Sequence, residues 1–142
     1  MGFIHDPEIA QQVVLAGIKK ADELGLNMAV AMVDDAGNLV AFARTKNARL
    51  AAIESVPAKA RTAVWFGRPT AQTVEAAEKR PTVYASILST SVNKLVLSMG
   101  GELLMQDGVI VGAVGSAGAS GDEDIIVSKV CVELWEKLTQ QK

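Results

Sequence analysis

The residues best suited to chemistry in this sequence are polar side chains at the edges of its expected helices and strands. Lys59 and Thr62 lie three positions apart in an expected helix and share one face of it. Both flank the apolar stripe of that helix and could point into a cleft beside a sheet. Alternatively, Lys59 is a surface charge whose aliphatic stem lies on the apolar rim. Arg44 closes an expected strand and offers a second positive charge.

Glu102 is unexpected, because this carboxylate follows two glycines in a strand-like context. It is either an edge-strand charge that discourages aggregation or an acid/base group. Burial beside apolar strands would raise its pKa toward neutrality, which suits a general base. Arg44 or Lys59 would then hold the negative charge of a substrate, while Glu102 transfers a proton. These three residues predict a cofactor-free isomerase, lyase or other proton-transfer enzyme. That hypothesis requires Glu102 and Lys59 to face one cavity within about 8 Å of each other.

Most familiar catalytic and cofactor motifs are absent. The single histidine, His5, excludes a histidine cluster and a metal triad of histidines, and a lone terminal histidine is usually solvated. The glycines after position 108 lack the Lys and Ser/Thr of a phosphate-binding loop, and they do not open a βαβ unit. Asp122 and Glu123 are expected only to cap the last helix.

Composition and charge bound the class of protein. The length of 142 residues predicts a single domain over 1–142, and the 49% hydrophobic and 4% aromatic content predicts an aliphatic core. A net charge of −2 without a basic cluster argues against nucleic-acid or anionic-membrane partners. No apolar run has the length of a membrane span, and the lone Cys131 fits a reducing compartment. We therefore expect a cytoplasmic protein.

The order of the expected helices and strands predicts an α+β domain with an antiparallel sheet. Asp6-Pro7 begins a helix that stops at Gly25. The other expected elements are strands at 28–33 and 39–44, a helix at 49–66 kinked or broken at Pro57, a helix at 70–79, a loop with a helical turn at 82–94, strands at 95–98 and on both sides of Asp107-Gly108, and a capped helix from Ser120.

Glycines recur at 112, 115 and 118 in the second strand of the Asp107-Gly108 hairpin and after it. Glycine inside a strand marks a bulge or a place where another group meets bare backbone. Two interpretations remain open. This strand forms a wall of a ligand cleft, or a helix crosses tightly over the glycines.

Several segments, in order along the chain, carry a family resemblance: Val33-Asp34-Asp35-Ala36-Gly37-Asn38, Lys59-Ala60-Arg61-Thr62-Ala63, Gly100-Gly101, the glycine-rich strand 108–118 and Asp122-Glu123-Asp124. This set resembles the GlcG/HbpS family of small proteins, which is also the domain at the carboxyl end of PduO-type proteins. The resemblance covers nearly the whole chain.

The resemblance implies an α-β-α layered, profilin-like domain with a five-stranded antiparallel sheet, assembled as a homo-oligomer. Some members bind haem, so it also implies a small-molecule ligand, with haem among the candidates. The ligand-binding residues it suggests are Thr62, Gly100, Gly101, Gly115 and Asp124. His5 would be the axial ligand of a haem iron.

The sequence departs from the family pattern at three places. Ala43-Arg44 lacks a histidine common in the second strand, Pro57 interrupts a helix, and Glu102-Leu103 replaces an apolar residue and a proline. Two of these changes fall beside the expected cleft and favour a specialised ligand or reaction. Three hypotheses follow: a protein that binds haem or a related molecule, a cofactor-free acid/base enzyme using Glu102, Lys59 and Arg44, and a purely structural oligomer.

Overall fold

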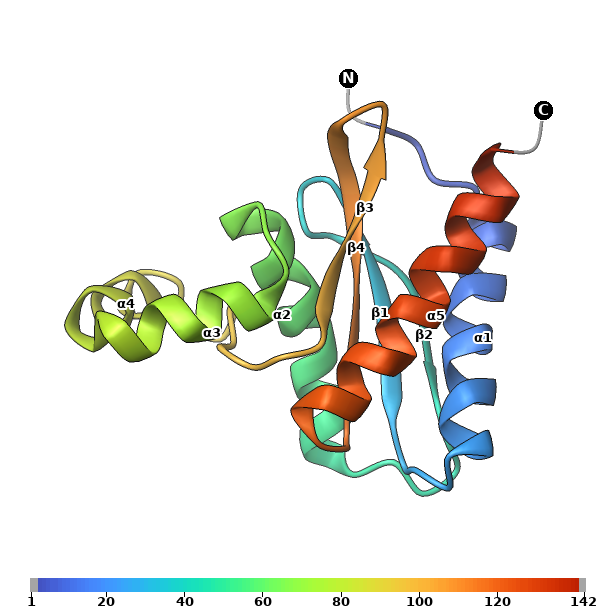
Figure 1. The fold of residues 1–142 in the computed structure, drawn as a ribbon, viewed down its shortest axis with the longest axis horizontal. Helices are drawn as coiled ribbons and strands as arrows, with labels where there is room; N and C mark the ends of the chain where they lie inside the picture. The colour runs from blue at the N-terminus through green and yellow to red at the C-terminus, as the bar shows by residue number, and fades with distance from the viewer. Residues whose placement is uncertain (1–2, 141–142) are drawn as a thin grey trace.

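The computed structural model describes residues 3–140, which pack around one antiparallel sheet (Figure 1). The elements are α1 (Pro7–Glu23), β1 (Ala29–Asp34), β2 (Leu39–Arg44), α2 (Leu50–Phe66), α3 (Thr70–Lys79), α4 (Pro81–Ser89), β3 (Gly101–Gln106), β4 (Val109–Ala117) and α5 (Gly121–Gln140). The strand order is β2-β1-β4-β3, so two hairpins meet along β1 and β4.

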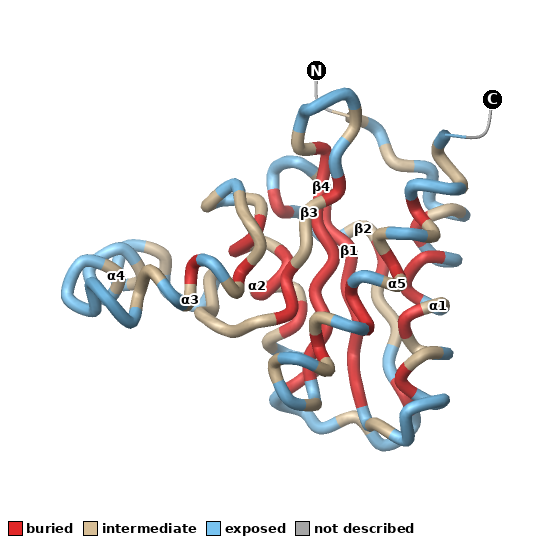
Figure 2. Tube along the Cα trace, viewed as in Figure 1, coloured by how far each residue is buried: buried red, intermediate tan, exposed pale blue. Residues whose placement is uncertain are grey.

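Helices cover both faces of this sheet. Helices α1 and α5 lie side by side on one face, and α2 crosses the other (Figure 1). The α1/α5 side buries larger side chains, including Met32, Leu104 and Trp135. The α2 side is built largely from alanine and valine, with Ala60 and Ala63 facing the strands. Buried residues follow the strands and the inward helix faces (Figure 2), which confirms the α+β class and the layers.

Local sequence signals placed several boundaries correctly. Asp6 Oδ1 accepts a hydrogen bond from Glu8 N at 2.8 Å and caps α1. Ser120 and Glu123 form a reciprocal capping box at the start of α5, with bonds of 3.1 and 3.2 Å. Asp107 and Gly108 both have positive φ, at 51° and 78°, as a tight hairpin turn requires.

The expected five-stranded sheet is wrong, since the sheet of the described residues 3–140 has four strands. The missing strand is 95–98, which crosses the surface of α2 without joining the sheet. Its Val96 amide donates to Oγ1 of Thr62 at 3.0 Å. A side chain of α2 thus satisfies a backbone group that a neighbouring strand would otherwise have bound.

Two further expectations need correction. The segment expected as a loop at 82–94 contains α4, whose Pro81 occupies the favoured first position of a helix. Of the kink or break expected at Pro57, the break is wrong, because α2 continues as one helix from Leu50 to Phe66. Helices α3 and α4 together form an arm that extends away from the sheet (Figure 1). No residue of α4 is buried within the chain.

The glycine strand is covered by α2 at Gly115, whereas Ala117 and Gly118 at its end line a pocket. A Cβ on Gly115 would lie 2.8 Å from the Ala60 nitrogen and 2.9 Å from the Val56 oxygen, both in the backbone of α2. A Cβ on Gly101 would lie 2.8 Å from the Lys59 oxygen. These glycines therefore let α2 contact the strands directly. Within residues 3–140, no helix has the length and apolar character needed to cross a membrane.

Candidate functional site

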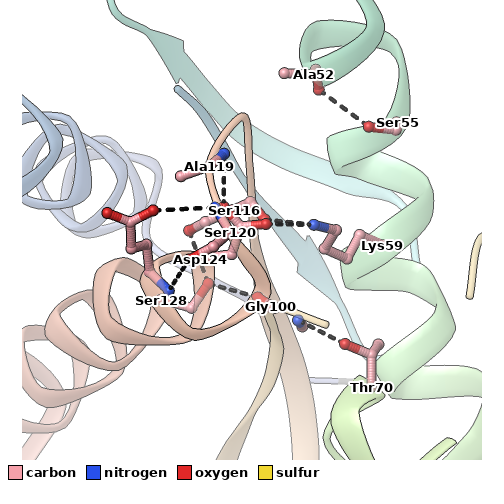
Figure 3. Close-up of polar contacts among 12 residues, drawn as sticks. Ala52, Ser55, Lys59, Thr70, Gly100, Ser116, Ala119, Ser120, Asp124 and Ser128 are labelled. Atoms are coloured by element: carbon pink, nitrogen blue, oxygen red, sulfur yellow. Dashed lines mark hydrogen bonds and ion pairs between the residues drawn. The ribbon is translucent and has the colours of Figure 1, made fainter. Parts of the chain in front are cut away.

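A buried ion pair links the two layers of helices. Lys59 comes from α2 on one side of the sheet and Asp124 from the first turn of α5 on the other. Lys59 Nζ lies 3.2 Å from Asp124 Oδ2 and donates to the Ser116 carbonyl oxygen at 2.8 Å (Figure 3). The two side chains are only 3% and 5% exposed. Because both side chains are almost fully buried, each charge depends on the other.

Glycine makes room for this pair. Gly100 precedes β3 with φ +116°, and a Cβ there would lie 2.8 Å from Asp124 Cβ and 3.3 Å from Lys59 Cδ. Ser128 on α5 hydrogen-bonds with the Gly100 carbonyl at 2.6 Å and with Ser116 Oγ at 2.7 Å. The polar groups around the pair are thereby fixed from β4, α5 and the chain before β3.

Burial shifts both partners toward their neutral forms. Desolvation lowers the pKa of Lys59, and the charge of Asp124 with its hydrogen bond opposes that shift. Desolvation also raises the pKa of Asp124, opposed by Lys59 and by the Ala119 amide, which donates to Oδ1 at 3.1 Å. Transfer of a proton from Nζ to Oδ2 would leave the total charge of the pair unchanged.

A pocket of about 300 Å³ opens beside this ion pair. Its charged groups are Lys59, Asp124 and Arg49, the exposed residue that precedes α2. The remaining lining residues are small: Ala51, Ala52, Ser55, Ser98, Ala117, Gly118 and Ala119. The pocket thus carries two positive charges and one negative charge.

The residues suggested by the resemblance take different places around the pocket. Asp124 lines the pocket and Gly100 lies against Asp124. Gly101 and Gly115 are covered by α2. Thr62 is buried, donates to the Ala58 carbonyl at 2.7 Å and does not line the pocket.

The structure does not bring Glu102 and Lys59 together. Gly101 and Leu103 face α2, so the strand alternation turns Glu102 toward α5. Burial raises the pKa of Glu102, and nearby Lys129 on α5 opposes that shift. The side chains of Glu102 and Lys59 thus start from opposite sides of the sheet, and Glu102 does not line the pocket that Lys59 lines.

Arg44 and His5 lie in two other places. Arg44 ends β2 at one edge of the sheet, donates to the carbonyl oxygens of Thr45 and Lys46 at 3.3 and 3.1 Å, and lines a separate pocket of about 380 Å³. His5 Nε2 lies 2.7 Å from the Val111 carbonyl oxygen, near the start of β4. The Lys59 pocket lies at the other end of that strand. No group of three potential metal ligands occurs within residues 3–140.

Sequence reasoning missed the pairing of Lys59 with Asp124 and the contribution of Arg49. The pair joins positions 65 apart, and no local spacing signals such a contact. The family resemblance had included both residues separately. Arg49 gave no signal beyond its place before an expected helix.

The layers and the buried pair define a class: an α+β domain with an antiparallel sheet and a polar pocket at the point where α2 and α5 meet. Residues 6–133 match the family described as "Haem degrading protein HbpS-like". The chain belongs to this HbpS-like family, as the sequence resemblance had indicated.

Individual relatives agree with this assignment. The structure of HbpS has a TM-score of 0.83 at 27% identity, covering 94% of this chain and 92% of that one. The PduOC:haem complex has a TM-score of 0.82 at 25% identity, covering 94% of this chain and 95% of that one. "Corrinoid adenosyltransferase PduO" of Citrobacter freundii is 27% identical over 130 residues. That match covers 92% of this chain, which spans only 38% of the relative's length.

Proposed function

We propose that this protein binds a small molecule and that the Lys59 pocket is its ligand site. One observation carries the proposal: a lysine that is almost fully buried lines the pocket while using only two acceptors, Ser116 O and Asp124 Oδ2. A charged lysine has three N–H donors. The remaining donor is available to an oxygen atom of a ligand in the pocket.

The surrounding charges narrow the ligand class. Arg49 and Lys59 outnumber Asp124, so the pocket favours a compact ligand with a carboxylate or another anionic group. Its volume of about 300 Å³ lies at the lower end of ligand sites, which span roughly 300–1,000 Å³. A small organic acid suits these limits.

Native mass spectrometry of the protein as purified tests this proposal. We expect the wild-type protein to carry a retained small ligand or to bind an added small carboxylate such as pyruvate. Arg49→Ala should weaken that binding. Arg44→Ala is the matched control, because Arg44 is an exposed arginine in another pocket. Equal loss in both variants would contradict the proposed site.

Haem is a second candidate ligand, favoured by the PduOC:haem relative. Haem iron takes histidine, cysteine, methionine or tyrosine as its axial ligand. None of these lines the Lys59 pocket, so its residues do not fit an axially ligated haem. His5 offers an imidazole beside Phe3 and Trp135, but its pocket of about 230 Å³ lies below the range of ligand sites. A haem would not fit wholly within it.

Titration with haemin separates the two candidates. A Soret band that appears on titration and is lost in His5→Ala would assign haem to His5. A flat titration, together with carboxylate binding, would leave the Lys59 pocket as the ligand site.

Lys59, Glu102 and Arg44 lie in three different places and do not form one acid/base site. Of the three, only Lys59 lines the proposed ligand pocket. Any proton transfer in the Lys59 pocket would instead use Asp124, the acidic residue in contact with Lys59.

We also propose that the protein is a cytoplasmic homo-oligomer that associates through the arm formed by α3 and α4. Helix α4 is apolar, yet none of its residues is buried within one chain. Val83 and Ile87 on α4 and Val92 just after it are 40%, 37% and 69% exposed. A second copy that covers these side chains would remove apolar surface from water.

A further inference from the structure

Lys59 is placed as a reactive amine would be. Its residue lines a pocket of about 300 Å³, and its nitrogen lies 3.2 Å from a carboxylate oxygen of Asp124. An ammonium group is not a nucleophile, so Lys59 must first lose a proton. Asp124 Oδ2 can accept that proton directly, without any exchange with bulk water.

Burial of the pair favours this transfer, whereas the attraction between the two charges opposes it. Burial favours the neutral form of both partners, because it lowers the pKa of Lys59 and raises the pKa of Asp124. Glu123, also on α5, adds negative charge that raises the pKa of Asp124 further. Arg49 faces the pocket from the start of α2.

Arg49 supplies a second, separate recognition element. No carboxylate of residues 3–140 lies within ion-pair distance of its guanidinium. A guanidinium is a planar donor fork that matches the two oxygens of a carboxylate. A ligand in the pocket would thus meet a carboxylate-binding group at the start of α2 and an amine at Lys59.

We infer that Lys59 forms a Schiff base with a small oxo acid whose carboxylate is held by Arg49. This inference rests on the proposed function, because it places the ligand in the same pocket. It adds a covalent step and names the reacting group of the ligand as a ketone or aldehyde carbonyl.

The step balances without any further reactant. Asp124 takes a proton from Nζ, and the neutral nitrogen attacks the carbonyl carbon to form a C–N bond. A proton moves from that nitrogen to the former carbonyl oxygen, which gives a carbinolamine. Asp124 then returns its proton to the hydroxyl group, and the C–O bond breaks to release water. The product is an iminium ion paired with the Asp124 carboxylate, so the charge of the pair is unchanged and nothing is oxidised or reduced.

Reductive trapping tests the inference on the full-length protein. The protein is incubated with pyruvate and sodium cyanoborohydride, and the modified lysines are mapped by peptide mass spectrometry. We expect one reduced pyruvyl adduct, located on Lys59. Lys79 is the internal control, since it pairs with Glu75 at 3.4 Å but its side chain is 74% exposed. Its reactivity reports ordinary surface chemistry in the same sample.

The variants Lys59→Arg and Lys59→Met should abolish the specific adduct while leaving Lys79 unchanged. An adduct distributed equally between Lys59 and Lys79, or found only on surface lysines, would overturn the inference even if both variants failed to fold.

Lactate, which has the carboxylate but no carbonyl, separates this inference from the proposed function. Lactate and pyruvate binding without an adduct on Lys59 would overturn only the Schiff base. Absence of binding by both acids would contradict the choice of ligand for the pocket as well.

Discussion

Lys59 and Asp124 meet at 3.2 Å although 65 residues separate them in the chain. One residue belongs to the helix on one face of the sheet and the other to a helix on the opposite face. Their contact is possible because Gly100 and Gly115 carry no side chains where the helices approach the strands. The candidate site is therefore a consequence of the packing of the layers. Substitutions can separate what the ion pair contributes to the stability of the fold from what it contributes to ligand binding.

Breaking the buried pair should strongly destabilise the fold. Lys59→Met leaves the Asp124 carboxylate buried without its partner, at a cost of about 3–5 kcal/mol in the free energy of unfolding. The double variant Lys59→Met/Asp124→Leu should recover most of this loss, because no unpaired charge remains. Urea denaturation measures both values.

The exposed pair Lys79–Glu75 provides the control for that experiment. Lys79→Met should cost at most about 1 kcal/mol. If Lys59→Met cost no more than Lys79→Met, the pair would not be excluded from water as described.

Gly115→Ala tests the close approach of α2 to β4. The added methyl group would meet backbone atoms of Ala60 and Val56 at 2.8 and 2.9 Å, and backbone cannot move as a side-chain tip can. We expect a loss of about 1–3 kcal/mol in stability, measured by urea denaturation.

Gly121→Ala is the comparison for that substitution. Its methyl group would meet the flexible side chain of Met99, with the sulfur at 2.8 Å. A smaller loss is expected because the thioether can move aside. Equal losses at both positions would show that backbone contact at Gly115 is not the determining factor.

Glu102 gives a prediction about pH. Burial raises the pKa of Glu102 above its ordinary value of 4.5, so the folded protein binds this proton more tightly than the unfolded chain does. Stability should therefore fall as the pH rises from about 4.5 through the raised pKa. Urea denaturation of the wild type and of Glu102→Gln can be measured at several pH values in that window. The stability of the wild type relative to the variant should fall as the pH rises. A constant difference would mean that Glu102 titrates alike in both states.

Self-association should depend on α4. Val83→Asp/Ile87→Asp places charges on the exposed apolar surface of the arm and should lower the solution mass measured by light scattering. Leu15→Asp on α1 is the control, because Leu15 is also exposed, at 50%. A mass unaffected by the α4 substitutions but reduced by Leu15→Asp would place the interface on α1.

Local chemistry made much of this fold predictable from the sequence. Capping groups at Asp6 and Ser120, and the turn at Asp107-Gly108, act within a few residues and located their elements. The apolar run at 95–98 predicts a strand, but it is not one, because an apolar pattern does not tell which group satisfies the backbone. Here Thr62 satisfies it, and that contact spans 34 positions.

The candidate site was less predictable, for the same physical reason. Lys59 was singled out from its place on a helix, and Asp124 from the family resemblance. The position of Glu102 beside Gly100-Gly101 predicts a partner for Lys59, but strand alternation turns Glu102 toward α5. A contact across the sheet follows from the packing of layers, which no local spacing encodes.

The central claim is that the Lys59 pocket is the ligand site, and amide chemical-shift mapping by NMR during a titration with pyruvate tests it most directly. We predict saturable shifts concentrated at the pocket residues Ser55, Lys59, Ser98, Gly118 and Ala119. Shifts confined to the residues around His5 or Arg44, with none in the Lys59 pocket, would contradict the account.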